Sequence, residues 1–217
     1  MRYKLVVFDV DGTITRHVSS WRYIHERLDL WDALAHKYQK KFLKGEISYA
    51  EFCRLDAMHW KGLKVKRLER IFKEIPLSKN ARPCIKRLKD AGFKLAAVST
   101  GIQFITERVK KELGLDYCIG NRLNAKNGVL TGTAKVNISY GQKGKALKRI
   151  LKIFNASPRQ AICVGDSDGD IPMMRLCGYS IAFNSKSRRL NGMADYVCRT
   201  SDFRDVCARI LKISKTG

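Results

Sequence analysis

The sequence predicts an α/β fold in which a doubly wound, mainly parallel sheet carries a smaller, inserted all-helical segment. Strand-like apolar runs alternate with helical runs from residue 80 onward, the pattern of a parallel sheet covered on both faces. An apolar strand also opens the chain, and residues 15–79 are helical by pattern. We therefore expect a core built from residues 1–14 and 80–217, with residues 15–79 inserted as a cap.

The inserted segment shows helical spacing of its apolar residues. They recur at intervals of three and four, at Trp21, Ile24, Leu28, Trp31, Leu34, Ala35, Tyr38 and Phe42. Gly45 ends this run, and Ser48 with Glu51 three residues later forms a capping-box pattern that opens a second helix. A third helical run over residues 68–75 stops at Pro76.

The remainder of the chain is predicted to alternate helices and strands. The expected order is helix 80–92, strand 93–100, helix 105–114, a short strand near Tyr117, a hairpin over 122–133, a helix from about 142, strand 161–166, a helix to Cys177, strand 179–183 and a helix from Asp202. Asn127-Gly128 suits the type I′ turn of the hairpin. In such sheets, functional sites form at the carboxyl ends of the strands.

Composition narrows the protein class. The seven cysteines are odd in number and include no Cys-x-x-Cys pair, which argues against a disulfide framework and a zinc ribbon. We expect neither a membrane span nor a signal peptide, because no apolar stretch is long enough and Met1 runs directly into a strand. A reducing cytoplasm is the simplest location.

The formal net charge of +23 has two interpretations. The excess of Lys and Arg is spread along the chain rather than gathered into an arm, which favours a solvated basic surface. Attraction to anionic substrates or nucleic acid is the alternative. The sequence does not indicate an oligomeric state.

Carboxylates gather at the ends of two predicted strands. Asp9 and Asp11 follow the first strand, and Asp166, Asp168 and Asp170 follow the strand at 161. Helix capping explains one aspartate at each place but not two clusters. Because side chains two apart in an extended chain point the same way, Asp9 and Asp11 can share one site. Oxygen-only ligands with open water positions favour Mg²⁺.

Two further features complete a site for phosphoryl chemistry. Ser99, Thr100 and Gly101 end a third strand directly before a helix, which suits an anion, although the same residues also form ordinary turns. Lys143 stands at the start of another helix, where its charge opposes the helix dipole, although a surface lysine is the alternative in so basic a chain. Together these groups predict attack on phosphorus by a carboxylate and proton transfer by a second aspartate.

These residues resemble the motifs of the haloacid dehalogenase superfamily. The matching segments are Asp9-Val10-Asp11-Gly12-Thr13, Ser99-Thr100-Gly101, Lys143 and Gly165-Asp166-Ser167-Asp168-Gly169-Asp170, with "GLDYCIGNRL", "NGVLTG" and "YSIAF" similar to the phosphoserine phosphatase branch. The resemblance implies a Rossmann-like core whose helical cap is a substrate-selecting lid. Because dehalogenases of this superfamily lack the second aspartate, Asp11 favours phosphate chemistry.

The resemblance also implies a role for each motif residue. Asp9 would be the nucleophile, Asp11 the acid/base, and Asp9, Asp166 and the backbone carbonyl of Asp11 the Mg²⁺ ligands. Substrate or phosphate contacts would come from Gly12, Thr13, Ser99, Thr100, Gly101, Lys143 and Arg54. Asp170 and Ser167 would support these groups from behind, with Asp170 positioning Lys143 or a metal-bound water.

Three departures bear on the substrate. Gly169 stands where the fourth motif usually has Asn or Asp, so one contact to phosphate is lost. Serine-specific members use a Glu and an Arg of the cap to hold the amino acid, and Val18 and Asp56 occupy those positions here, although Arg54 lies nearby. We therefore predict a Mg²⁺-dependent phosphomonoesterase for a small phosphorylated metabolite that is inefficient on phosphoserine.

Two alternatives remain open. A phosphomutase of the same superfamily needs a His or Lys from the cap, for which His17 is the candidate. A nucleotide- or nucleic-acid-directed phosphatase or binding protein would use the basic surface instead. Arg16, His17, Tyr49 and Arg54 are the cap residues expected to face substrate, whereas the tryptophans are expected in the cap interior.

Overall fold

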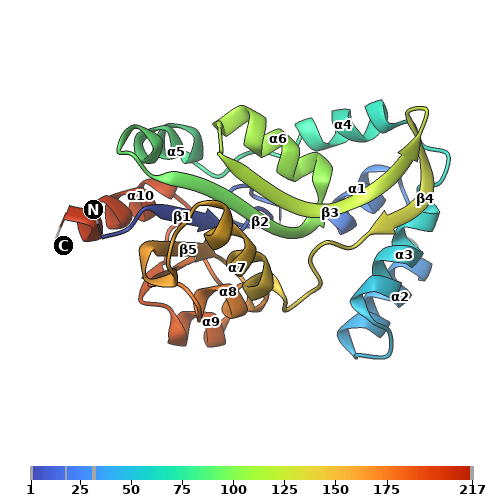
Figure 1. Cartoon of the computed structure of the whole chain (residues 1–217). Coiled ribbons are helices and arrows are strands. Elements are labelled where there is room, and N and C mark those ends of the chain that lie inside the picture. The colour runs from blue at the N-terminus through green and yellow to red at the C-terminus, as the bar shows by residue number, and fades with distance from the viewer. Residues whose placement is uncertain (1, 18, 31–32, 216–217) are drawn as a thin grey trace.

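The computed structural model describes residues 2–17, 19–30 and 33–215. Its sheet has the strand order β4-β3-β2-β1-β5-β6-β7. The central strand β1 (Leu5–Phe8) pairs in parallel with β2 (Lys94–Ile102) on one side and β5 (Ala161–Gly165) on the other. Beyond these lie β3 (Tyr117–Lys126), β6 (Tyr179–Phe183) and β7 (Tyr196–Cys198), all parallel, whereas the edge strand β4 (Val129–Lys135) is antiparallel. The predicted doubly wound, mainly parallel sheet is confirmed (Figure 1).

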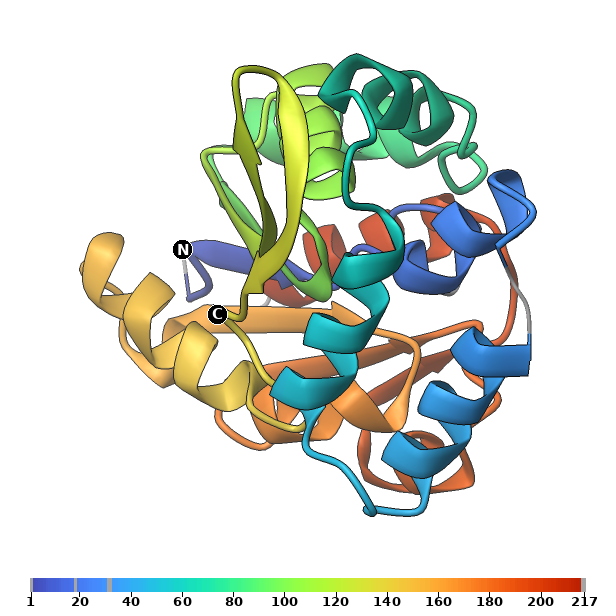
Figure 2. The ribbon, with the colours of Figure 1, turned by 90° about the vertical axis from the view of Figure 1, so that its right-hand side faces the viewer.

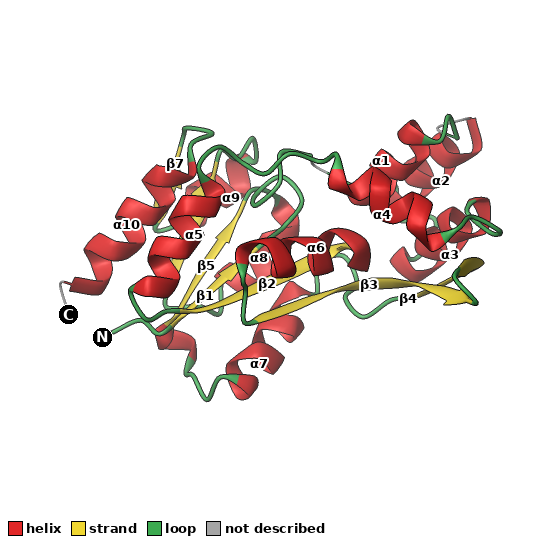
Figure 3. Cartoon of the chain, turned by 90° about the horizontal axis from the view of Figure 1, so that it is seen from above, coloured by secondary structure: helices red, strands yellow, loops and turns green. Residues whose placement is uncertain are grey.

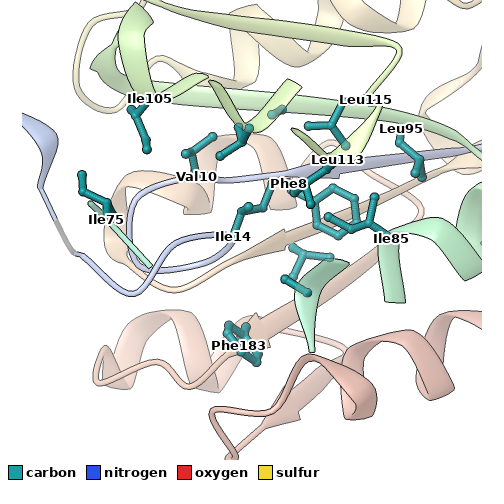
Figure 4. Close-up of a cluster of buried hydrophobic side chains, with 14 of the residues drawn as sticks. Phe8, Val10, Ile14, Ile75, Ile85, Leu95, Ile105, Leu113, Leu115 and Phe183 are labelled. Carbon is teal, nitrogen blue, oxygen red and sulfur yellow. The ribbon is translucent and has the colours of Figure 1, made fainter. Parts of the chain in front are cut away.

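Alternation along β1 divides the core between the two faces of the sheet. Val6 and Phe8 belong to one buried cluster, and Leu5 and Val7 to the other. Figure 4 shows the first of these clusters, in which Phe8 lies among side chains from several elements. By the same alternation Asp9 continues on the side of Leu5 and Val7.

Helices cover both faces. The Phe8 face packs against α5 (Ala81–Asp90), α6 (Gln103–Leu113) and α10 (Phe203–Lys215). The Val7 face packs against α7 (Lys143–Ile153), α8 (Ile171–Met174) and α9 (Arg188–Met193). No helix in the described part of the chain is both long and apolar enough to cross a membrane.

The inserted segment forms four helices, here called the cap helices: α1 (Ser20–Arg27), α2 (Ala33–Leu43), α3 (Tyr49–His59) and α4 (Val65–Lys73). The apolar run that looked continuous is divided after α1, and Asp29 there has a left-handed φ of 55°. Ser48 caps α3 as expected by accepting a hydrogen bond from the Glu51 backbone, but the Glu51 carboxylate bonds Arg54 instead of closing the capping box. The limits of the cap, residues 15–79, stay a prediction.

The hairpin of β3 and β4 contacts the cap helices and is hydrogen-bonded to the segment between α3 and α4. Asn127 and Gly128 have φ of 52° and 74°, as the predicted type I′ turn requires. The backbone of Gly62 donates to Leu130 at 3.0 Å, and that of Val65 donates to Gly128 at 2.9 Å. Figures 2 and 3 show the hairpin reaching out from the core to lie beside α3.

Three local predictions were incomplete. The strand expected at 93–100 continues to Ile102, and the short strand near Tyr117 is the full inner strand of the hairpin. The helix α9 and the strand β7 were not predicted, because six and three residues are too few to show a period.

Of the tryptophans, Trp21 and Trp60 stack inside the cap at a centroid distance of 5.6 Å, and Trp31 lies outside the described residues.

Candidate active site

The site lies where the chain reverses its direction of travel across the sheet. The chain runs outward from β1 through β2 to the hairpin and then returns to β5 on the other side of β1. The carboxyl ends of β1, β2 and β5 therefore meet at a topological switch point, where doubly wound sheets bind ligands. Asp9 follows β1 and Asp166 follows β5, whereas Ser99, Thr100 and Gly101 lie in the last residues of β2.

Lys143 joins two of the aspartates. Its ammonium group contacts Asp9 Oδ1 and lies 2.6 Å from Asp170 Oδ1, and all three side chains are buried. Burial raises the pKa of Asp9, while Lys143 acts in the opposite direction. Burial alone would lower the pKa of Lys143, but Asp170 and Asp9 outweigh it and raise this pKa. The lysine is therefore a fixed positive charge beside the proposed nucleophile.

Asp170 is held on its other oxygen by the backbone. Its Oδ2 accepts hydrogen bonds from the backbone N–H groups of Asp166 and Ser167, both at 3.0 Å. A Cβ at Gly165 would collide with the Asp170 carboxylate, so only glycine fits there. Asp170 therefore holds the Lys143 ammonium group with Oδ1 while its Oδ2 is held by the backbone.

Asp11 is held from both the core and the cap. Its Oδ2 accepts hydrogen bonds from Ser99 Oγ at 2.9 Å and from Ser20 Oγ of α1 at 3.3 Å. Its Oδ1 is buried and has no hydrogen-bond partner among the described residues. Burial raises the pKa of Asp11, and the bonds from Ser99 and Ser20 offset part of this effect. A protonated Asp11 would direct its hydrogen at the unpartnered side, where a leaving oxygen can accept it.

Asp9 and Asp166 form the oxygen set suited to a cation. Oxygens of Asp9, Asp166 and Asp170 lie within 4.8 Å of one another, and Asp170 is already engaged. Burial raises the pKa of Asp166 to about 6, with the charge of Asp170 adding to the effect. Crowded, buried carboxylates of this kind are stabilised by a hard divalent cation, and their donor set fits Mg²⁺.

Thr13 and Gly12 lie against these carboxylates. The Thr13 hydroxyl is buried, 3.1 Å from Asp166 Oδ1 and 3.5 Å from Asp9 Oδ2. Gly12 has φ of 85°, and a Cβ there would lie 2.5 Å from Asp166 Oδ2. The Thr13 side chain thus orients the carboxylates and Gly12 makes room for them, and phosphate binding by these two residues stays a prediction.

The turn after Val98 gathers hydrogen bonds from three elements. The ladder between β2 and β3 is irregular between Val98 and Ile102, which releases Ser99, Thr100 and Gly101 from regular pairing. Ser99 Oγ accepts from the Gly101 backbone at 2.7 Å. The Thr100 carbonyl accepts from the side chains of Trp21 at 3.0 Å, Tyr49 at 2.6 Å and Asn121 at 2.8 Å. This carbonyl links the segment 99–101 to the cap helices α1 and α3.

A cavity of about 200 Å³ opens onto these groups. Its polar end is formed by Asp9, Asp11, Thr100, Gly101, Lys143 and Ser167, and its other side by Ser19, Ser20, Trp21, Gln39, Phe42, Leu43, Tyr49, Phe52 and Tyr140. Tyr49 faces the cavity as predicted. Trp21, predicted as interior only, also contributes to the lining, and Phe42, Gln39 and Tyr140 were not predicted as site residues.

Several expected substrate contacts lie elsewhere. Arg54 is exposed on α3, where its guanidinium bonds the Glu51 carboxylate at 2.7 and 2.8 Å. Arg16 and His17 are absent from the described lining, and His17 lies 3.8 Å from Glu26. Arg54 was expected at the substrate because it is near Asp56 in sequence, but its position on the helix directs it outward.

The two positions matched to charged serine-binding residues also differ. Asp56 is buried inside the cap, with Oδ1 3.3 Å from His25 Nε2. Burial raises the pKa of Asp56, and the bond to His25 acts against this. Val18 lies outside the described residues. Asp168, in the second aspartate cluster, contacts the Ser187 hydroxyl and lies 3.7 Å from Arg189, away from the other carboxylates.

Comparison with known proteins identifies the family of this chain. The profile of haloacid dehalogenase-like hydrolases matches residues 6–175. The chain belongs to this family. Membership of this family shows that the protein is an enzyme, and its similarity to phosphoserine phosphatases supports phosphatase activity.

Relatives of known name cover most of the chain. A phosphoserine phosphatase of Archaeoglobus fulgidus is 36% identical over 184 residues, 84% of this chain and 53% of that protein, so the chain spans about half of its length. A phosphoserine phosphatase of Methanocaldococcus jannaschii is 30% identical over 94% of this chain and 95% of that protein. A phospho-aspartyl intermediate analogue of a phosphoserine phosphatase superposes with a TM-score of 0.81, at 30% identity over 96% of this chain and 99% of that one.

Proposed function

We propose that the protein is a Mg²⁺-dependent phosphomonoesterase that forms an aspartyl-phosphate on Asp9 and acts on a small phosphorylated metabolite. The observation that carries this proposal is the buried contact of Asp9 with Lys143, next to Asp166 and facing the same cavity as Asp11. A nucleophile, a fixed cation and an acid then converge on one phosphoryl group.

The residues divide the reaction between them. Asp9 attacks phosphorus through a carboxylate oxygen as the bond to the leaving oxygen breaks, and Asp11 gives that oxygen its proton. In the second half, Asp11 takes a proton from the water that attacks the aspartyl-phosphate, which releases inorganic phosphate and regenerates Asp9. Lys143 and the Ser99–Gly101 turn stabilise the negative charge of the phosphoryl oxygens throughout.

Asp9, Asp166 and the Asp11 backbone carbonyl would hold the Mg²⁺ ion. When bound, the ion neutralises charge on the phosphoryl group and on the carboxylates around it. Thr13 supports the same carboxylates from behind, since its hydroxyl lies between them.

We further propose that phosphoserine is a poor substrate for this chain, although the relatives above are named phosphoserine phosphatases. The cap residues on the described lining include no charged side chain that would pair with an amino group or a carboxylate. Burying the amino group or the carboxylate of serine without an oppositely charged partner costs about 3 kcal/mol. Arg54 is turned outward to Glu51, and Asp56 is enclosed with His25.

The alternatives receive less support. Neither a His nor a Lys of the cap occurs on the described lining, as a phosphomutase would need. The basic residues remain a possible attraction for anions in general, but the cavity is too small for a polynucleotide. The free state of all seven cysteines agrees with the reducing, cytoplasmic location that we propose.

A panel of phosphorylated metabolites, assayed for inorganic phosphate with and without Mg²⁺, tests the proposal. We expect release that needs the metal, that a chelator abolishes and that Asp9→Asn abolishes as well. Full activity in Asp9→Asn, or in chelator-treated protein, would overturn the assignment. Phosphoserine turned over far better than every other monoester would overturn the substrate statement alone.

A further inference from the structure

The leaving-group side of the cavity is lined by aromatic rings, here called the aromatic wall: Trp21, Phe42, Tyr49, Phe52 and Tyr140. We propose that the substrate is a phosphomonoester whose leaving group carries a small, flat, uncharged apolar ring that lies against this wall. The inference rests on the proposed phosphatase activity and specifies its substrate class.

Phe42 stands at the centre of the wall. Its ring centroid lies 5.3 Å from that of Phe52, 5.4 Å from that of Tyr49 and 5.6 Å from that of Tyr140. The contacts with the two tyrosines are edge-to-face, whereas Phe42 and Phe52 are stacked, so the rings form one continuous aromatic cluster beside the cavity. A ring of the substrate would continue this pattern.

Two polar groups of the wall are already used. The Tyr49 hydroxyl and the Trp21 indole N–H both donate to the Thr100 carbonyl, so these residues present ring surface and not hydrogen-bonding groups. Ser20 is engaged with Asp11, and Ser19 caps α1 through its side chain. Gln39 and the Tyr140 hydroxyl remain for polar contacts with the leaving group. Ring surface with a few placed polar groups is typical of small-molecule sites.

The mouth of the cavity exposes apolar surface. Tyr140 is 50% exposed and Leu43 is 73% exposed, and both belong to the lining. Contiguous exposed apolar surface beside a cavity is a feature of ligand-binding grooves. Burial of this surface by an apolar ring would contribute to binding, whereas a polar leaving group would leave it uncompensated.

Gly169 adjoins Tyr140. A Cβ on Gly169 would lie 3.5 Å from Tyr140 Cε2, which is ordinary van der Waals contact. The position where the fourth motif usually has Asn or Asp is therefore next to the aromatic wall, and a longer side chain there would change the surface beside the ring.

Size and charge narrow the class further. A cavity of about 200 Å³ suits a phosphoryl group with one small ring better than a nucleotide. A quaternary ammonium also binds aromatic rings. The described lining from the cap supplies no carboxylate to balance such a cation, which favours an uncharged ring.

The test compares monoesters of alcohols with similar leaving ability: benzyl phosphate, propyl phosphate, phosphocholine and phosphoserine. We expect kcat/KM for benzyl phosphate to exceed that for each of the others by about tenfold or more. The ratio of benzyl to propyl phosphate should fall in Phe42→Ala, Tyr140→Ala and Gly169→Asn, and persist in Tyr140→Phe, which retains the ring. Ile153→Ala, which changes a similarly exposed residue at the end of α7, is the matched control and should leave the ratio unchanged.

Binding provides a readout that needs no turnover. Asp9→Asn, titrated calorimetrically in Mg²⁺ buffer, should bind benzyl phosphate more tightly than propyl phosphate. Asp9-dependent hydrolysis of all four esters with equal kcat/KM, or with phosphocholine or phosphoserine preferred, would overturn the ring proposal and leave the phosphatase assignment standing. Hydrolysis of none of them, or hydrolysis that survives Asp9→Asn, would overturn both.

Discussion

Tyr49 of cap helix α3 donates its hydroxyl to the backbone carbonyl of Thr100 at a distance of 2.6 Å. Thr100 belongs to the turn that we assign to phosphate binding, between Ser99 and Gly101. The bond therefore couples the position of the cap to the geometry of the catalytic core. Burial raises the pKa of Tyr49 well above its usual value, which keeps the phenol protonated as a donor near neutral pH.

Removing this hydroxyl tests the coupling. Tyr49→Phe retains the ring but leaves the Thr100 carbonyl with the Trp21 and Asn121 donors. We expect a loss of about 1 kcal/mol in the free energy of unfolding and a several-fold fall in kcat/KM. Denaturant titration and steady-state kinetics measure the two effects. Tyr38→Phe on α2, outside the cavity lining, is the control, and an equal kinetic effect there would contradict the coupling.

Asp170 should be essential for keeping Lys143 in place. In Asp170→Asn the buried ammonium group loses one of its two carboxylate partners, and an amide nitrogen would face two backbone N–H donors unless the side chain turned. We expect a loss of about 3 kcal/mol in the free energy of unfolding, together with a large fall in kcat. Chemical denaturation provides the first value. Asp168→Asn in the same motif should cost less than about 1 kcal/mol, because Asp168 forms partly exposed contacts.

Ser20 should tune the proton of Asp11. A hydrogen bond to the ionised carboxylate favours ionisation, so removing it in Ser20→Ala should raise the pKa of Asp11 beyond the increase that burial causes. Since Asp11 must be protonated to assist the leaving oxygen, the alkaline limb of the kcat profile should move to higher pH. Ser48→Ala, which removes the cap of α3 without touching Asp11, should lower stability and leave this limb in place. A limb that moves down in Ser20→Ala would disprove the role.

Asp202 should make stability depend on acid pH. The Arg204 side chain, with Asn80 and the Arg204 backbone, lowers the pKa of Asp202 well below its usual range. A lowered folded-state pKa contributes stability that is present above the unfolded value of about 3.9 and is lost as the pH falls. Asp202→Asn should therefore lower Tm at pH 7, and the difference from the unaltered protein should shrink as the pH drops below that value. Asp90→Asn, in an exposed pair with Lys86, should show little change in a thermal scan.

The ends of β1 and β5 were the structural feature that the sequence predicted best. The apolar runs before Asp9 and Asp166 predicted β1 and β5. Because sites form at the carboxyl ends of such strands, the sequence also predicted that Asp9 and Asp166 lie close together, as the structure shows. Asn127-Gly128 likewise predicted its turn, because few residue pairs tolerate two positive φ values. Local backbone chemistry was sufficient in each of these cases.

The direction of individual side chains could not be read in the same way. The resemblance implied a phosphate contact for Thr13 and did not indicate that its hydroxyl bonds Asp166. Arg54 and Asp56 are two residues apart on one helix, and packing directs one to solvent and the other into the cap. Tyr140 precedes a helix in an unremarkable loop, so its place beside Phe42 follows only from the tertiary fold.

A transient covalent bond between Asp9 and phosphorus is the central claim. Rapid acid quenching of the enzyme during turnover of a monoester in Mg²⁺, followed by intact mass and peptide mapping, measures it most directly. The account predicts a species heavier by one phosphoryl group, with the added mass on the peptide that contains Asp9. Turnover with no such species at any quench time, or a phosphoryl group found on another residue, would contradict it.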